Sequence, residues 1–218
     1  YAPSAAHQQI LQDPDIHYRV FNTSVSPTSD SYTSYHHRSV GGYHGAKLIR
    51  YQDLIENQIA KNNVDVLSML NTKYFIGERE GQEIAQRNPG ALGNAWFVER
   101  VKWVPDADAE MQALNQDVFE PALEAVVDER YREALSGIGK PGAKAGIRLT
   151  SYDPKRMVYE ANNNGQTDAL AVFSEIYYEG VDNDWKVAVD GESVDHIRVN
   201  YLLRGLRLAP GQHEVVFT

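Results

Sequence analysis

The part of the chain after residue 146 constrains the fold most, because short runs rich in β-forming residues alternate there with turn signals. Seven such runs follow one another: "IRLTSYD", "RMVYEAN", "DALAVFSEIYY", "DWKVAVDG", "SVDHIRVN", "LLRGLRLA" and "HEVVFT". The turn signals are Asp153-Pro154, Asn162 to Gly165, Asp190-Gly191 and Pro210-Gly211. Short strands in close succession are typical of an antiparallel sandwich. We therefore predict a β-sandwich over residues 147–218, of the jelly-roll or immunoglobulin-like type.

The segment before this region has the composition of a linker. Residues 137–146, "GIGKPGAKAG", combine four glycines, a proline and lysines and show no periodic apolar pattern. Such segments separate compact regions of a chain. We therefore predict a first subdomain over residues 1–136.

The first subdomain mixes helical and strand patterns. The clearest helix is Ala46 to Asn62, where Leu48, Tyr51, Ile55 and Ile59 recur at spacings of three and four residues. Asp65 is in a position to cap a second, short helix that ends at Leu70, and a third helix opens at Pro105 and Asp106. Strands are predicted in "IHYRVFN", "TKYFIG", "AWFVERVKWV" and "LEAVVDE", the last of which also fits a helix.

Two polar stretches separate these elements. Residues 22–39 are rich in Ser, Thr and Asp and predict a long loop, and residues 77–94 predict an excursion between two strands. Together these patterns predict an α+β protein: an N-terminal α/β subdomain with a small mixed sheet, followed by a C-terminal antiparallel β-sandwich.

Composition excludes several classes of function. The formal net charge is -9 and the basic residues are scattered, whereas a nucleic-acid groove needs clustered Lys and Arg, so we expect no nucleic-acid partner. No cysteine is present, which excludes disulfides and thiolate metal sites. The apolar runs fall short of the roughly 20 residues that a membrane-spanning helix needs. Because the chain begins without Met and stops inside an alternating strand pattern, we expect it to be a piece of a longer protein.

The only clustered imidazoles are those of His36, His37 and His44, while the other histidines are dispersed along the sequence. Adjacent residues of an extended chain point in opposite directions, and no carboxylate completes a ligand set, so we expect no metal site. Glycines before the predicted helix allow a polar or anion-binding turn that involves His36, His37, Tyr43 and His44. The alternative is that these side chains lie at the surface or hydrogen-bond within a loop.

Aromatic residues also flank one predicted loop of the sandwich, in the stretch "EIYYEGVDNDW". Tyr177, Tyr178 and Trp185 are candidates for a glycan-binding platform, since aromatic faces stack on the C–H surfaces of sugars and nearby polar groups bind hydroxyls. Core packing is the alternative explanation.

No catalytic set is recognisable. The GxSxG elbow of serine hydrolases is absent, and acidic pairs such as Asp13/Asp15 stand in turn-like contexts where Asp bonds locally. We predict no catalytic residue and no cofactor.

Several segments, in order, resemble the YfhO family of bacterial integral membrane proteins, in the version found in Bacteroidetes-type bacteria. They are "DPDIHYRVFN", "SVGGYHGAKLIRYQDLI", "VLSMLNTKYFI", "NPGALGNAWFV" and "LAVFSEIYYEG…WKVAVDG…IRVNYLLRGLRLAPGQHEVVF". The segments "GEREGQEIAQR" and "LNQDVFEPALEAVVDERYREALSG" match no motif of that family.

The resemblance implies a polytopic membrane protein with a fold like that of transferases that use lipid-linked sugars. This chain would be its soluble region on the extracytoplasmic, periplasmic face of the inner membrane. The implied partners are the transmembrane part of the same polypeptide and a glycan or lipid-linked sugar. No residue here matches the catalytic acid of such enzymes, so the fragment is expected to be non-catalytic and to help position a glycan or acceptor. The alternatives are a carbohydrate-binding module and a purely structural or protein-interaction domain that packs through residues 22–39.

Overall fold

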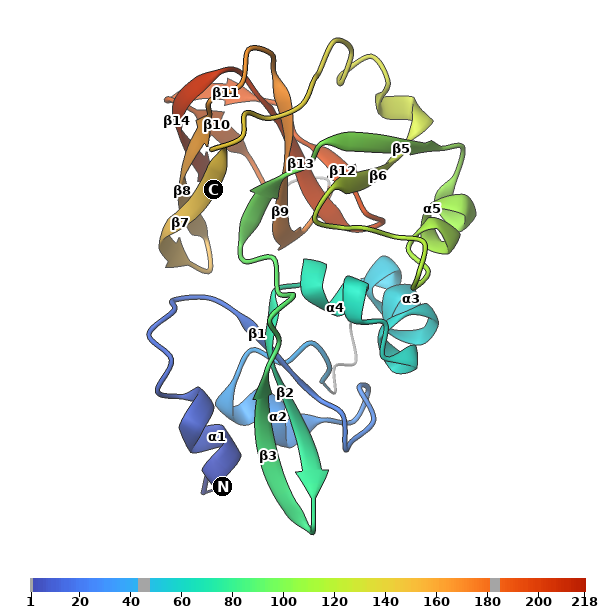
Figure 1. Ribbon diagram of the computed structural model, residues 1–218, viewed down its shortest axis with the longest axis vertical. Helices are drawn as coiled ribbons and strands as arrows, with labels where there is room; N and C mark the ends of the chain where they lie inside the picture. Colours follow the sequence, from blue (N-terminus) through green and yellow to red (C-terminus); the bar gives the residue numbers. More distant parts are fainter. Residues whose placement is uncertain (1, 43–47, 181–184) are drawn as a thin grey trace. The chain divides into compact units, whose positions relative to one another are not determined.

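The computed structural model describes residues 2–42, 48–180 and 185–218, and the chain forms two compact units, Tyr1–Gly93 and Asn94–Thr218 (Figure 1). Each sheet lies within one of the two units. No helix in these ranges is both long enough and apolar enough to cross a membrane.

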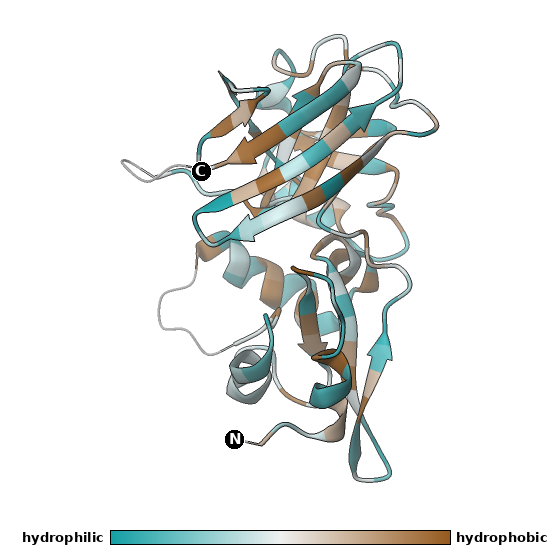
Figure 2. Ribbon diagram, turned by 90° about the vertical axis from the view of Figure 1, so that its left-hand side faces the viewer, coloured by the Kyte–Doolittle hydropathy of each residue, from teal (hydrophilic) through white to brown (hydrophobic). Residues whose placement is uncertain are grey.

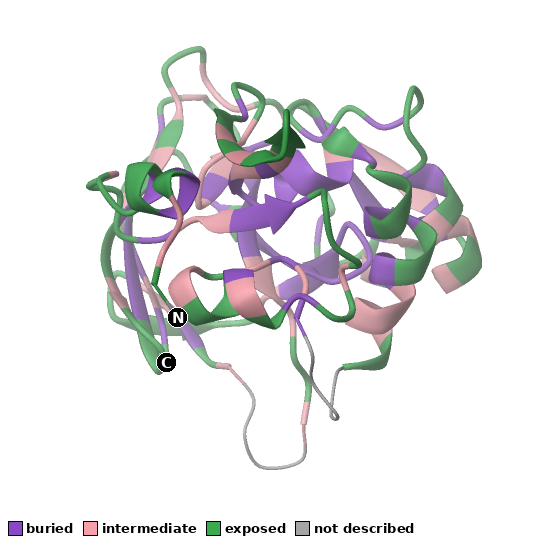
Figure 3. Cartoon of the chain, turned by 90° about the horizontal axis from the view of Figure 1, so that it is seen from below, coloured by how far each residue is buried: buried purple, intermediate pink, exposed green. Residues whose placement is uncertain are grey.

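The first unit combines short helices with one sheet. Its elements are α1 (Ala5–Ile10), β1 (Arg19–Asn22), α2 (Ser31–His36), α3 (Ile49–Asn57), the 3-10 turn η1 (Ile59–Lys61), α4 (Val64–Met69), β2 (Thr72–Arg79) and β3 (Gln82–Arg87). Strand β2 is central, parallel to β1 and antiparallel to β3. The predicted small mixed sheet is therefore confirmed. Its core includes Ile10, Val20 and Ile76, and the helices carry both buried and exposed residues (Figure 3).

The polar excursion predicted for residues 77–94 is wrong, because most of it is a hairpin. Strand β2 continues to Arg79 and returns as β3 through Glu80 and Gly81, both with positive φ of 54° and 76°. This end of the hairpin is exposed, so its strands carry charged residues on both sides and lack the alternation that marks a half-buried strand.

The helices of the first unit also differ from prediction. The predicted long helix is described from Ile49 to Asn57, after which η1 leads to Asn62, whose left-handed φ of 56° ends the helical path. The side chain of Asn63, rather than that of Asp65, caps α4 by accepting the backbone N–H groups of Asp65 and Val66. Residues 22–39 are not all loop, because they contain α2.

A charged cluster joins the segment before β1 to strand β2. The Nζ of Lys73 lies 2.6 Å from Asp13 Oδ2 and also contacts Asp15, and Tyr74 donates its hydroxyl to Asp13 at 2.7 Å. Burial by itself would raise the pKa of Asp13, but the hydrogen bonds from Lys73, the Asp15 backbone and Tyr74 hold it at about 2.

Acid should therefore weaken the first unit through Asp13. Since its pKa is lowered on folding from 3.8 to about 2, its stabilising effect is complete above pH 3.8 and is lost as pH falls toward 2. We expect Asp13→Asn to lower the free energy of unfolding at pH 7 by about 1–2 kcal/mol and to flatten its pH dependence between pH 4 and 2. Chemical denaturation across that range measures both effects. The exposed Asp108→Asn is the control, and equal behaviour of the two variants would contradict the prediction.

The second unit is mainly strand. Its elements are β4 (Ala95–Phe97), β5 (Arg100–Val104), α5 (Ala107–Ala113), β6 (Glu124–Asp128), the 3-10 turn η2 (Glu129–Tyr131), β7 (Gly146–Asp153), β8 (Arg156–Asn163), β9 (Ala169–Ile176), β10 (Val187–Val189), β11 (Glu192–Val194), β12 (Ile197–Val199), β13 (Leu203–Leu208) and β14 (Gly211–Phe217). The predicted strand "LEAVVDE" and the helix after Asp106 are both present, as β6 and α5.

Two antiparallel sheets make the sandwich, with strand orders β11-β10-β14-β8-β7 and β12-β13-β9-β4. Their facing side chains form one core, at whose centre Tyr159, Phe173 and Phe217 meet edge to face. The strands of this unit show alternating hydrophilic and hydrophobic segments in Figure 2, which is the pattern of sheets with one buried face. The α+β fold with its antiparallel sandwich is thus as predicted.

The prediction of a single strand in "AWFVERVKWV" is wrong. Strand β4 joins the sandwich beside β9, with Trp96 opposite Val172, while β5 pairs in parallel with β6. The backbone changes partner in between, since Val98 donates to Leu170 O and Glu99 donates to Leu123 O. Both faces of the segment are partly apolar, so periodicity does not reveal the break.

The β5–β6 pair is hydrogen-bonded to Asn200, the residue that follows β12. Val126 of β6 donates its N–H to the Asn200 side chain and accepts the Asn200 N–H, both at 2.8 Å. Residues 94–136 therefore belong to the second unit, whereas the sequence placed them in the first subdomain. Of the predicted linker, residues 137–145 form a loop inside that unit and Gly146 begins β7. Gly139 in this loop donates its N–H to Asp168 O.

Candidate functional site

A pocket of about 300 Å³ lies at one end of the sandwich, and all three predicted glycan-binding residues line it. Tyr177 and Tyr178 directly follow β9, and Trp185 precedes β10. Five further side chains with polar groups line the same pocket: Glu179, Lys186, Ser193, Asp195 and His196.

Strand pairing fixes the backbone on both sides of the pocket. The N–H of Tyr177 donates to Leu202 O at 2.7 Å, which extends the pairing of β9 with β13 beyond Ile176. Lys186 and Thr218 exchange backbone hydrogen bonds of 2.8 and 2.9 Å, which hold the residue next to Trp185 against the end of β14. The aromatic residues therefore stand on sheet ends rather than on unsupported loops.

The indole of Trp185 is held by a buried arginine. Arg204 is only 2% exposed, and its guanidinium carbon lies 4.2 Å from the Trp185 ring centroid and 5.0 Å from that of Phe217. Its Nε donates to Ile176 O at 3.1 Å, which sets the plane of the guanidinium. Stacking of a desolvated guanidinium on an aromatic face is favourable by about 2 kcal/mol. One face of Trp185 is thus occupied from inside the protein, and the partly exposed side chain borders the pocket.

Tyr177 supplies a hydroxyl that stays protonated. Burial raises the pKa of Tyr177 to about 12, and the neighbouring Tyr131 and Glu179 contribute. Its ring lies 5.1 Å from that of His196, between centroids. The phenol is therefore a hydrogen-bond donor at every physiological pH.

Tyr178 is the most accessible of the three rings, with 40% of the residue exposed. A Cβ at Gly180 would lie 2.7 Å from Tyr178 Cε1, so the ring packs directly over the backbone of that glycine. The position of the ring therefore depends on the absence of a side chain at residue 180.

The arrangement suits a polyhydroxylated ligand. Aromatic rings offer apolar faces to sugar C–H groups, while carboxylate, ammonium and imidazole groups, all present in the lining, are able to hydrogen-bond to hydroxyls. A sugar can stack only on a ring that solvent reaches. Tyr178 is exposed, whereas Tyr177 and Trp185 are half-buried. Tyr177, Tyr178 and Trp185 therefore do more than fill the core, because all three also line the pocket.

The second predicted set, the histidine-rich turn, is only partly described. Tyr43 and His44 lie outside the described residues. His36 ends α2, and His37 follows it as the C-cap, so they do not alternate as they would on an extended chain. Their ring centroids are 6.3 Å apart.

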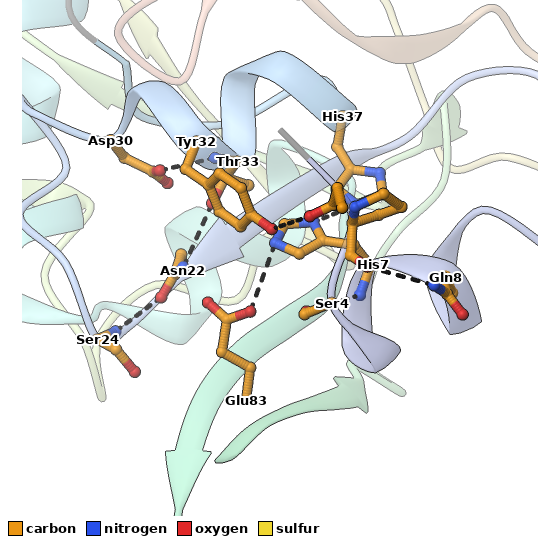
Figure 4. A network of polar contacts seen from close by, with 12 residues as sticks. Ser4, His7, Gln8, Asn22, Ser24, Asp30, Tyr32, Thr33, His37 and Glu83 are labelled. Atoms are coloured by element: carbon orange, nitrogen blue, oxygen red, sulfur yellow. Dashed lines mark hydrogen bonds and ion pairs between the residues drawn. The ribbon is translucent and has the colours of Figure 1, made fainter. Parts of the chain in front are cut away.

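The structure adds His7, which the sequence treats as dispersed. Nδ1 of His7 lies 2.8 Å from Nε2 of His37, and the ring centroids of His7 and His36 are 5.0 Å apart. His7 Nε2 also lies 3.7 Å from Oε2 of Glu83 (Figure 4). Thirty residues separate His7 from His37, so only the fold brings these side chains together.

A pocket of about 400 Å³ adjoins the cluster, and Tyr35, His36, His37 and Arg38 contribute to its lining. Within the described ranges, no group of three or more His, Asp or Glu side chains has the geometry of a metal site. The contacts within the cluster are hydrogen bonds and ring contacts among the histidines.

Comparisons with protein-family models, with curated proteins and with solved structures found no match to this chain.

Proposed function

We propose that the chain is the extracytoplasmic domain of a polytopic membrane protein that resembles the YfhO family. In this proposal it lies at the periplasmic face of the bacterial inner membrane, is non-catalytic by itself, and holds a glycan or acceptor for the transmembrane part of the same polypeptide. The observation that supports glycan binding is the convergence of Tyr177, Tyr178 and Trp185 on one pocket. The membrane context rests on the resemblance of the segments described above.

The size of the pocket suggests what it binds. Its volume of about 300 Å³ is at the lower end of the range for small-molecule sites. We expect it to accommodate one sugar residue of a longer glycan, with the rest of the chain in solvent. Tyr178, the most exposed ring, would then stack on that residue.

Removal of the Tyr178 ring should weaken glycan binding without loss of stability. We expect Tyr178→Ala to raise the Kd for a bound bacterial envelope glycan about five- to tenfold, because an aromatic contact is worth about 1 kcal/mol. An array of such glycans identifies the ligand, and calorimetry with the best-bound oligosaccharide measures both proteins.

Tyr35→Ala is the matched control, since Tyr35 is a tyrosine of the first unit that is 68% exposed. An empty array for the wild-type protein, or an equal loss of affinity in Tyr35→Ala, would contradict glycan binding at this pocket. Turnover of a lipid-linked sugar by the 218-residue chain itself would contradict the non-catalytic role.

A second candidate, a protein-interaction role of the first unit, has its own observation. Leu11 and Tyr35 are 54% and 68% exposed and line the same pocket, and Ile16 nearby in sequence is 51% exposed. Large exposed side chains gathered in one region are typical of contact surfaces. A photo-crosslinking residue at position 35 of the full-length protein tests this: crosslinks to its transmembrane part would favour a docking role for residues 22–39.

A further inference from the structure

His7 is a titratable side chain in a fully buried position. The residue is 0% exposed, although an imidazole gains a charge near neutral pH. It belongs to α1, and its contacts reach α2, the residue after α2, and β3. Figure 4 shows His7 between His37 and Glu83, with the ring of Tyr32 beside it. The imidazole therefore ties α1 to the remainder of the first unit.

Burial opposes a second positive charge on the pair, and the neighbouring charged groups act in both directions. Asp30 at the N-cap of α2 and Glu83 on β3 favour the charged form of His7, and His36 opposes it. Glu83 is 3.7 Å away and its side chain is partly exposed, so its attraction is weakened by solvent. The rings of Tyr32 and Tyr35 pack edge to face against His7 and His36, respectively.

The hydrogen bond between the two imidazoles depends on how many protons the two rings carry. In a neutral pair, one ring nitrogen donates its proton and the other accepts it. The nearby carboxylate of Glu83 favours a proton on Nε2 of His7, so its Nδ1 is the acceptor and His37 Nε2 is the donor. If both rings are protonated, two N–H groups face each other over 2.8 Å and the bond is lost.

We propose that His7 and His37 form a proton-operated clasp, which holds α1 on α2 and β3 at neutral pH and releases it when both imidazoles are protonated. Release of α1 would move Leu11 away from Tyr35, His36 and His37, with which it lines a pocket. The clasp would thus expose this region of the first unit in acid.

The expected pH window follows from the direction of the shifts. Burial lowers the pKa of His37 from 6.5 to about 4, with the neighbouring His7 and His36 adding to it, and burial also lowers the pKa of His7. The released state therefore binds more protons than the closed state between pH 6.5 and 4. Closure is complete above pH 6.5 and weakens as pH falls toward 4. This window lies above that of Asp13, so the two effects are separable.

Hydrogen exchange of the α1 amides tests the clasp on the whole chain. After correction for intrinsic rates, we expect the protection of α1 to fall about tenfold or more between pH 7.5 and 4.5. His37→Gln retains an amide donor that does not titrate, and in this variant the fall should largely disappear. Unchanged protection in the wild-type protein, or a wild-type response in His37→Gln, would overturn the proposal.

Glu83→Gln provides a second measurement that does not depend on folding of the first variant. Because the Glu83 carboxylate favours protonated His7 in the closed state, its removal makes that state bind the proton less well and should shift the midpoint of α1 release to higher pH. His213→Gln, in the second unit, is the control and should leave the response of α1 unchanged. A midpoint that does not move in Glu83→Gln, or that moves equally in His213→Gln, would contradict the clasp.

Discussion

Replacement of Glu110 by alanine is expected to lower the free energy of unfolding of the second unit by about 3–5 kcal/mol. Glu110 is 0% exposed, and its Oε1 accepts the N–H of Tyr201 at 2.8 Å. Its Oε2 lies 3.5 Å from the guanidinium of Arg198, a residue only 6% exposed. The substitution leaves a buried cation and a buried N–H group without these acceptors, and each carries a desolvation penalty.

Glu99→Ala is the matched control for this prediction, because Glu99 pairs with Lys140 at the surface. A surface pair of this kind contributes about 0–1 kcal/mol. Urea denaturation of both variants at pH 7 compares the two effects directly. If Glu110→Ala loses no more stability than Glu99→Ala, the buried network does not stabilise the sandwich.

Arg204→Ala should destabilise the second unit by about 2–4 kcal/mol and also weaken glycan binding at the proposed site. The substitution empties the space between Trp185 and Phe217 and removes the donor to Ile176 O. Trp185 then loses the contact that orients its ring. Denaturation measures the first effect, and calorimetry with the glycan identified for the wild-type protein measures the second.

Arg207→Ala is the control, because Arg207 lies on the same strand but is half-exposed and pairs with Asp168. We expect this variant to retain glycan affinity. Arg204→Met, which keeps the aliphatic part of the side chain, should recover part of the stability but not the stacking on Trp185. Glycan affinity that is unchanged in Arg204→Ala would show that the orientation of Trp185 does not matter for binding.

The sandwich was predictable because its strands are short and rich in β-forming residues, and because clear turn signals separate them. The break between β4 and β5 was not, since Val98 and Glu99 change hydrogen-bond partners without any change in apolar pattern. The hairpin of β2 and β3 was missed because its exposed end lacks apolar residues. Its end is solvated on both sides and has no apolar pattern to detect.

The residues of the candidate site also fall into two groups, those that the sequence places together and those that only the fold brings together. Tyr177, Tyr178 and Trp185 flank one loop between consecutive strands, so proximity in sequence was sufficient to group them. His196 and Arg204 reach the same region through the pairing of β12, β13 and β9, which composition does not specify. His7 contacts His37 only because α1 packs against the rest of the first unit, and no local sequence pattern predicts that contact.

The bond between Glu110 and Tyr201 has a consequence for synthesis of the protein. Its two residues are separated by 91 positions, and β4 likewise pairs with β9 across a long stretch of chain. Closure of such long loops costs entropy before any contact compensates for it, so folding dominated by them is slow. The second unit therefore cannot complete its fold until β14, which pairs with both β8 and β10, has left the ribosome. Until then β4 to β6 remain incompletely packed. Aggregation during translation is the hazard that this topology creates.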